Sequence, residues 1–304
     1  MKIVFMGSPD FAIPSLEKLM ASPHEIAAVV SNPDKRRGRG SETSPTAVKA
    51  RAMKAGLPVI SVDDLSSDIF ADELEKLEAD LFVVVAFRIL PKRILEIPTK
   101  GSINLHASLL PKYRGAAPIH WAVINGEEKT GCTVFFLDEK VDTGSIIKQG
   151  ETPIGPNETT GDLYGRLKEM GSKLLLDAVD EIEYGSYSLS PQDDSKATPA
   201  PKLFTEDCRI DFDGQAQNIH NKIRGLSPFP TAWAELDDLK FNMYRSSVGD
   251  TERYKPGQIG LHDGQMMVGT KDKDLILQEV QIQGKRRMSG RDFMNGYSGT
   301  GIIH

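Results

Sequence analysis

The sequence predicts an α/β fold, with a doubly wound, mostly parallel, Rossmann-like sheet in its first half and a smaller β-barrel in its second half. Three observations support this prediction. Short apolar runs alternate with helical patterns through the first half of the chain. The run LFVVVA, residues 81–86, is apolar throughout, as expected for a parallel strand that helices cover on both faces. Beyond Pro201, short strands and turn signals replace this alternation.

The elements of the first half follow in order along the chain. Strands are predicted at Lys2–Met6, Glu25–Ser31, Leu57–Ser61, Leu81–Ala86, Ile103–His106 and Cys132–Leu137. Helices are predicted at Ile13–Met20, with Pro14 in the first turn and Asp10 as a possible cap, and at Pro45–Ala55, with Gly56 in the C′ position. The segment Gly7-Ser8-Pro9 is not G-x-G-x-x-G, which argues against a bound dinucleotide. A ligand of such a sheet is expected at the carboxyl ends of its strands.

The second half begins after one long amphipathic helix, predicted at Thr160–Glu183. A stretch rich in Ser, Pro, Asp and Ala follows and is typical of a linker. Short strands are then predicted at Thr231–Leu236, Lys240–Tyr244, Met266–Gly269 and Leu275–Gln281, which favours an OB-like barrel. A length of 304 residues suits two domains. We therefore expect a catalytic domain at 1–185, a linker at 186–204 and a barrel at 205–304.

Composition excludes several classes of protein. No apolar run is long enough to span a membrane, and the N-terminal segment is typical of a first strand, not a signal peptide. Cys132 and Cys208 lack metal-ligand spacing. We expect a cytoplasmic, monomeric protein without bound metal. The net charge of −6 argues against broad nucleic-acid affinity, yet cations cluster at residues 35–39 and 285–287. Each cluster is either a binding surface or a solvated turn.

The densest group of polar side chains lies between Gly101 and Gly144. Asn104 and His106 are two residues apart on one strand and share a face, and Asp142 stands in a turn that Gly144 closes. An amide and an imidazolium can stabilise the oxyanion of a tetrahedral intermediate, and an aspartate can hold the imidazole or accept a proton from an amine. The residues alone leave other roles open. His106 could be a structural hydrogen-bonding group, Asn104 a cap and Asp142 an ordinary turn residue.

The wider segment resembles the folate-dependent formyltransferase family. The family pattern N-x-H-x-S-L-L-P-x-Y-R-G stands here at residues 104–115, and its second signature, D-x-G, at residues 142–144. The resemblance implies 10-formyltetrahydrofolate as co-substrate, no metal, and Asn104, His106 and Asp142 as catalytic residues. It implies folate contacts at Ser108, Leu109, Leu110 and Pro111, and a pterin-binding stretch at Phe87, Arg88, Ile89 and Leu90.

Two further features are similar to the family member that formylates methionine on charged initiator tRNA. One is the loop NPDKRRGRG, residues 32–40, which implies tRNA contacts at Arg36, Arg37 and Arg39. The other is the C-terminal half, with contacts implied at Lys285, Arg286 and Arg287. Residues 205–304 nevertheless hold 13 Lys and Arg against 14 Asp and Glu, a net charge of −1, and Ser41 and Glu42 replace the usual lysines. The alternatives are a sugar-nucleotide N-formyltransferase and a catalytically silent RNA-binding protein.

Overall fold

The computed structural model describes residues 1–36, 43–299 and 301–304. The chain forms two compact units, and neither is continuous in sequence. The first comprises residues 1–115, 131–152 and 165–199, and the second comprises residues 116–130, 153–164 and 200–304.

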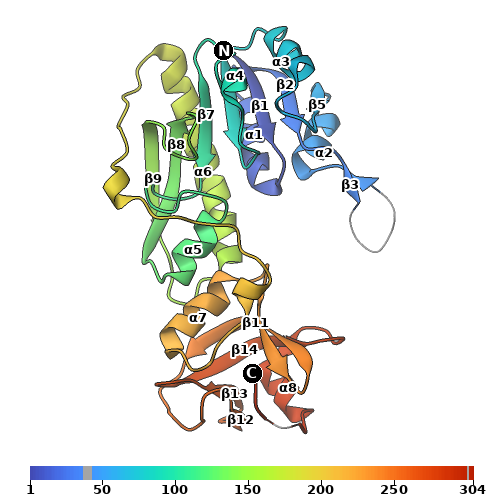
Figure 1. The fold of residues 1–304 in the computed structure, drawn as a ribbon, viewed down its shortest axis with the longest axis vertical. Coiled ribbons are helices and arrows are strands. Elements are labelled where there is room, and N and C mark those ends of the chain that lie inside the picture. Colours follow the sequence, from blue (N-terminus) through green and yellow to red (C-terminus); the bar gives the residue numbers. More distant parts are fainter. Residues whose placement is uncertain (37–42, 300) are drawn as a thin grey trace. The chain divides into compact units, whose positions relative to one another are not determined.

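The first unit is built on a seven-stranded sheet with the order β5-β2-β1-β6-β7-β8-β9 (Figure 1). The strands are β1 (Lys2–Gly7), β2 (Glu25–Ser31), β5 (Val59–Ser61), β6 (Leu81–Val85), β7 (Ser102–His106), β8 (Lys129–Phe136) and β9 (Ile146–Pro153). Neighbours from β5 to β7 pair in parallel, whereas β7 and β8 are antiparallel. The order along the chain reverses between β1 and β6, which makes this pair the topological switch point where such sheets bind ligands.

The sheet's central strands are buried because helices and loops cover them. All five residues of β6 are buried, as the uninterrupted apolar run predicts. The helices before β7 are α1 (Ile13–Met20), α2 (Ala47–Lys54), α3 (Asp68–Glu75) and α4 (Lys92–Leu95). Asp10 does not cap α1. It lies in a short 3-10 turn, η1 (Asp10–Ala12), and Ala12 precedes the helix without a side-chain cap. The predicted Gly56 is in the left-handed conformation just after α2, with φ of 73°.

Two short strands flank the basic loop. β3 (Lys35–Arg36) pairs with β4 (Thr43–Ser44) in antiparallel register. Residues 37–42 between them lie outside the described part of the chain, as do the side chains of Lys35 and Arg36.

The long predicted helix is present as α6 (Thr160–Tyr184). Four of its apolar positions at helical spacing, Leu163, Leu167, Leu175 and Val179, are completely buried. A shorter helix, α5 (Pro118–Ile124), was not predicted and contributes to the second unit.

The second unit has an antiparallel sheet with the order β10-β11-β14-β13-β12, and β15 pairs with β14. Its strands are β10 (Ala232–Leu236), β11 (Leu239–Val248), β12 (Ile259–His262), β13 (Gln265–Gly269), β14 (Asp274–Ile282) and β15 (Met288–Ser289). The last residues of the chain join its two edges: Ile303 bridges to Leu236 of β10, and Ile302 bridges to Gln258 just before β12. These bridges pair part of each edge of the sheet with the end of the chain. Helices α7 (Ala216–Gly225) and α8 (Gly290–Asn295) contribute to its core.

The stretch predicted as a linker does not form a separate tether over its whole length. Residues up to Pro199 pack with the first unit, and the second unit resumes at Ala200. Backbone hydrogen bonds between Ser190 and Ile146 in both directions, at 2.8 and 2.9 Å, fix the start of this segment at the beginning of β9.

Candidate active site

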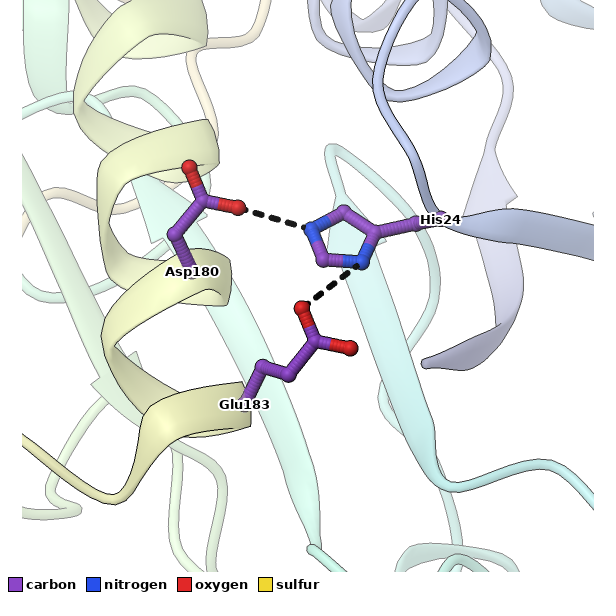
Figure 2. A group of neighbouring side chains, drawn as sticks. All are labelled: His24, Asp180 and Glu183. Atoms are coloured by element: carbon purple, nitrogen blue, oxygen red, sulfur yellow. Dashed lines mark hydrogen bonds and ion pairs between the residues drawn. The ribbon is translucent and has the colours of Figure 1, made fainter.

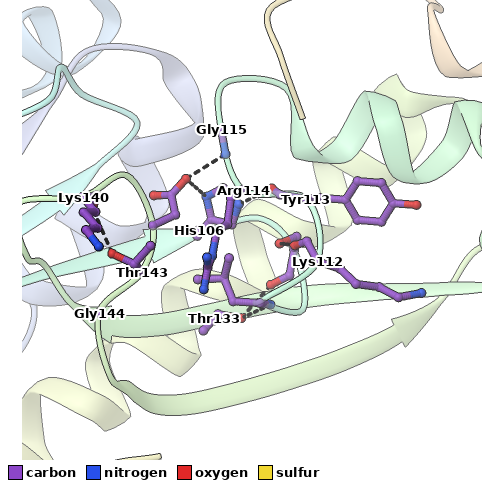
Figure 3. Close-up of polar contacts among 12 residues, drawn as sticks. His106, Lys112, Tyr113, Arg114, Gly115, Thr133, Lys140, Thr143 and Gly144 are labelled. Atoms are coloured by element: carbon purple, nitrogen blue, oxygen red, sulfur yellow. Dashed lines mark hydrogen bonds and ion pairs between the residues drawn. The ribbon is translucent and has the colours of Figure 1, made fainter. Parts of the chain in front are cut away.

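The His106 imidazole is held at the end of β7 by a group that the sequence did not indicate. Its Nε2–H donates to the backbone carbonyl of Tyr113 at 2.8 Å (Figure 3). Its Nδ1 lies 3.7 Å from Oδ2 of Asp142, which is too long for a direct hydrogen bond. Both ring nitrogens therefore face acceptor groups, although only Nε2 is within hydrogen-bonding distance of one. Because Nε2 already donates to the Tyr113 carbonyl, Nδ1 is the ring nitrogen that remains for contact with a bound molecule.

Asp142 is fixed by its backbone and by its carboxylate. It is only 9 % exposed and has φ of 55°, a left-handed conformation that costs a non-glycine residue on the order of 1–3 kcal/mol, least for Asp and Asn. The N–H of Gly115 donates to its Oδ2 at 2.8 Å. Gly144 closes the turn, since a Cβ there would lie 1.7 Å from the carbonyl oxygen of Phe136. The sharp turn brings the loop after β8 back towards His106, although β8 itself ends beside the start of β7.

Asn104 occupies the middle of β7, paired with Val84 of β6 and Phe135 of β8, and not a strand end. Its spacing from His106 places both side chains on one face of the sheet. The side chain is half-buried, and its amide forms no hydrogen bond with any described residue. Its donor group is therefore available to a bound molecule on the His106 side of the strand.

The predicted folate-contact loop is rigid. Ser108 is completely buried, and its hydroxyl donates to the carbonyl of Lys112 at 2.6 Å. Thr133 of β8 accepts the Leu110 N–H at 3.1 Å and donates to the Ser108 carbonyl at 2.7 Å. Gln149 donates to the Leu110 carbonyl at 2.9 Å. With Ser108 and Leu110 turned inward, Leu109 and Pro111 are the partly exposed side chains of the loop.

The predicted pterin-binding stretch follows β6 at the switch point of the sheet. Leu90 is buried in the core, whereas Ile89 is 73 % exposed and Phe87 is half-buried. Arg88 donates from its two Nη atoms to the carbonyls of Val62 and Asp63, and its guanidinium lies 5.4 Å from the centre of the Phe87 ring. Within the described chain, the backbone groups of residues 87–90 form no hydrogen bonds with other backbone groups.

Two residues of the segment predicted as a linker contact the candidate site, and the sequence analysis did not predict them. The Gln192 side-chain amide donates to the carbonyls of Asp142 and Gly144, both at 2.9 Å. The Thr198 hydroxyl accepts the backbone N–H of Tyr113 at 2.9 Å. We refer to residues 190–199 as the strap. A Ser/Pro-rich composition carries no periodic signal, so nothing in the sequence marks these contacts.

The predicted tRNA-binding residues fall into two groups. Arg37 and Arg39 lie outside the described residues, as does the side chain of Arg36. Lys285, Arg286 and Arg287 lie between β14 and β15 and are exposed. The Arg287 guanidinium stacks on Tyr244, 3.5 Å from the ring centre.

One further cluster has a spacing that a metal ion could bridge: ligand atoms of His24, Asp180 and Glu183 lie within 4.8 Å of one another (Figure 2). The two carboxylates face different ring nitrogens of His24, at 2.9 Å for Asp180 and 3.7 Å for Glu183. The amino group of Met1 lies 2.7 Å from Glu183 and 3.3 Å from His24. The amino group of Met1 thus offsets part of the negative charge of the two carboxylates, and these contacts join the start of β2 to α6.

Neither cysteine is poised to act as a nucleophile or metal ligand. Burial raises the pKa of the Cys132 thiol to about 12, and it also raises the pKa of Cys208. In the described part of the chain, no helix combines the length and the apolar character needed to cross a bilayer.

The fold and the site agree with two family models that together span most of the chain. The model described as formyl transferase matches residues 1–179, and the one described as formyl transferase, C-terminal domain, matches residues 202–298. These matches define the class of protein as a formyl-group transferase. A methionyl-tRNA formyltransferase from Parabacteroides distasonis is 42% identical over 310 residues, covering 98% of this chain and 96% of the relative. The chain therefore belongs to the methionyl-tRNA formyltransferase family, and the family and fold class predicted from the sequence are confirmed.

Solved structures share the fold at lower identity. An N-formyltransferase from Helicobacter canadensis, in complex with folinic acid and dTDP-3-aminofucose, has a TM-score of 0.68 at 22% identity and covers 91% of this chain and 98% of its own. HypX from Aquifex aeolicus, in complex with tetrahydrofolic acid, has a TM-score of 0.67 at 17% identity and covers 100% of this chain and 50% of its own. These neighbours support the architecture.

Proposed function

We propose that this protein transfers the formyl group of 10-formyltetrahydrofolate to the free amino group of methionyl initiator tRNA, in the cytoplasm and as a monomer. The observation that supports the reaction is the arrangement of Asn104, His106 and Asp142 on one face of β7 and its neighbouring loop. The near full-length identity of 42% to a methionyl-tRNA formyltransferase supports the acceptor.

The proposed reaction needs no covalent bond to the protein. The amine nitrogen attacks the formyl carbon, and the carbonyl oxygen becomes an oxyanion. The Asn104 amide and Nδ1–H of His106 donate to that oxygen, which is the interaction that most lowers the barrier in acyl transfer. Asp142 lies beside Nδ1 and takes up the proton that the attacking nitrogen loses, directly or through a water. The carbon–nitrogen bond to the folate then breaks, and N10 of the folate receives a proton.

The residues assigned to the folate fit a flat heterocycle with a polar edge. Residues 87–90 offer unpaired backbone N–H and C=O groups beside the apolar side chains of Phe87 and Ile89. Such a segment can pair with the edge of a pterin as it would with a strand. Leu109 and Pro111 offer further apolar contacts, whereas the buried Ser108 hydroxyl serves the loop itself.

The acceptor is tested by incubation with 10-formyltetrahydrofolate and either charged initiator tRNA or amino-sugar nucleotides. We expect formylation of the tRNA-bound methionine alone. Formylation of a sugar nucleotide in its place would reject the proposed acceptor and retain formyl transfer. No formylation of either amine would reject the reaction.

Arg39→Ala is expected to raise the Michaelis constant for charged tRNA and to lower turnover, with the constant for the folate nearly unchanged. The loop carries four cations within residues 35–39, whose mutual repulsion phosphates would relieve. It leaves the sheet beside a cleft of about 320 Å³ lined by residues such as Ser8, Asn32 and Thr46. Steady-state kinetics with purified initiator tRNA provide the measurement. Unaltered tRNA kinetics would remove this loop from the acceptor site.

A row of side chains across the barrel sheet supports an RNA partner. Arg209, Trp233, Asn242 and Gln281 are paired in sequence from strand to strand and therefore share a face. The Trp233 ring lies under two cations, Arg209 at 5.5 Å and Lys240 at 5.0 Å. At the other end of the row, the Gln281 side chain accepts a hydrogen bond from the Tyr244 hydroxyl and donates one to the Lys285 carbonyl. The Arg287 guanidinium stacks on the ring of the same Tyr244. The aromatic rings gather these cations on the sheet, which suits phosphate binding.

Replacing Arg209, Lys240 and Arg287 together by glutamine is expected to weaken tRNA binding and to flatten its salt dependence. If each cation contacts one phosphate, the slope of log K against log salt should fall in magnitude by about 2 to 3. Direct binding titrations at several salt concentrations provide the measurement. A matched control replaces Lys255, Lys271 and Lys273, which lie outside the row and carry the same total charge. Equal slopes for the two triple variants would contradict a specific role of the row.

A further inference from the structure

We propose that Gln192 and Thr198 of the strap, residues 190–199, act as positioning residues for the His106 imidazole. The inference rests on the proposed role of His106 and Asp142 in formyl transfer. Two groups face the imidazole, the carbonyl of Tyr113 and the carboxylate of Asp142, and both residues have a left-handed backbone conformation. Thr198 holds Tyr113, and Gln192 holds Asp142.

The first group is the carbonyl of Tyr113, which accepts the His106 Nε2–H. Tyr113 is a bulky residue with φ of 63°, a conformation that persists only where the surroundings impose it. Its backbone N–H donates to the Thr198 hydroxyl, and the next N–H, that of Arg114, donates to the Thr198 carbonyl at 2.9 Å. Thr198 therefore fixes both ends of the Tyr113–Arg114 turn, and with it the carbonyl that orients the ring.

The second group is the carboxylate of Asp142, which has φ of 55°. The Gln192 amide spans the turn by donating to the carbonyls of Asp142 and Gly144. Its Oε1 accepts from Nε and Nη2 of Arg114, at 3.1 and 2.7 Å. The reverse orientation of the amide would place its oxygen against two carbonyls and its NH₂ against a guanidinium, so the contacts determine the orientation.

All four hydrogen-bonding positions of the Gln192 amide are thereby filled. Arg114 is anchored in turn by Asp194 of the strap at 2.8 Å, and its side chain is only 15 % exposed. The strap thus joins the loop that carries Tyr113 to the loop that carries Asp142. A passive tether between two domains requires no such contacts. This segment sets the separation between His106 and its carboxylate, on which transfer of the proton depends.

The test uses the full-length protein and the isosteric change Gln192→Glu. Glutamate retains an acceptor for Arg114 but replaces two N–H donors with an oxygen that faces the carbonyls of Asp142 and Gly144. We expect kcat to fall about a hundredfold, as a small misplacement of catalytic groups can cause, with both Michaelis constants nearly unchanged. Lys196→Gln is the matched control, because Lys196 lies in the same strap and pairs only with Asp193 on the surface. It should keep wild-type kcat.

A second pair of variants separates positioning from folding. Thr198→Val removes the hydroxyl while keeping the shape, and Thr198→Ser restores it. We expect Thr198→Val to lower kcat and Thr198→Ser to recover most of it. The two Thr198 variants also test the proposal if Gln192→Glu does not fold.

The ¹⁵N NMR signals of the His106 ring in the substrate-free protein distinguish positioning from a merely structural role, which would leave them unchanged. These signals are assigned by their loss in His106→Ala. Changed tautomer populations or a changed titration of His106 in Gln192→Glu and Thr198→Val, but not in Lys196→Gln, would support the proposal. Unchanged ring signals, with kcat equal to that of Lys196→Gln, would overturn it. Changed ring signals in a protein that formylates neither amine would reject the proposed function and leave the positioning role standing.

Discussion

Alanine at Asn104 or at His106 is expected to lower turnover by about two to three orders of magnitude, with little loss of folate binding. Removing one oxyanion donor typically costs about 3–4 kcal/mol in the transition state. The ground state loses less, because the Asn104 amide has no partner among the described residues and Nδ1 of His106 has no direct one. Single-turnover kinetics, combined with equilibrium folate binding, separate the two effects.

The two substitutions differ in their structural cost, which provides an internal control. Asn104 is half-buried, so its truncation should leave the fold intact, whereas His106 is 7 % exposed and its loss removes a buried hydrogen bond to the Tyr113 carbonyl. His106→Gln retains a donor near that carbonyl and should fold like the wild type while remaining slow. Near-normal turnover in both alanine variants would show that this pair does not stabilise the oxyanion.

Asp142→Asn is expected to be as damaging as the loss of His106, and to change the pH dependence of the rate as well. Asparagine tolerates the left-handed backbone as aspartate does, and its side-chain oxygen can still accept the Gly115 N–H. The variant therefore removes the negative charge and keeps the turn. A neutral amide cannot accept the amine's proton or stabilise the charged imidazole.

The measurement is kcat over the pH range in which the protein stays folded. We expect the pH profile of kcat in Asp142→Asn to differ in shape from that of the wild type, because the variant lacks a carboxylate that could take up the proton of the amine. Its residual rate should be low throughout. An unchanged rate and profile would leave Asp142 as a turn residue only.

The sequence by itself determined the fold class and predicted the candidate site residues Asn104, His106 and Asp142. The apolar run at 81–86, the helical periodicity of 160–183 and the paired spacing of Asn104 and His106 are local patterns, and local patterns report which face of an element is buried. The motif at 104–115 indicated the family, and full-length relatives confirm it. The prediction that Asp10 caps a helix was wrong. Aspartate is a residue type that often caps helices, but Asp10 lies in a 3-10 turn.

The tertiary structure alone decided which groups hold the candidate catalytic side chains. Gln192 reaches Asp142 across 50 residues and Thr198 reaches Tyr113 across 85, and contacts over such separations leave no periodic signal in the chain. Residues 186–204 were predicted to be a linker because their composition lacks apolar periodicity. That absence shows only that the segment does not bury a hydrophobic face. It does not show where its polar side chains and backbone groups find their hydrogen bonds, and these bonds join the strap to the loops that carry Tyr113 and Asp142.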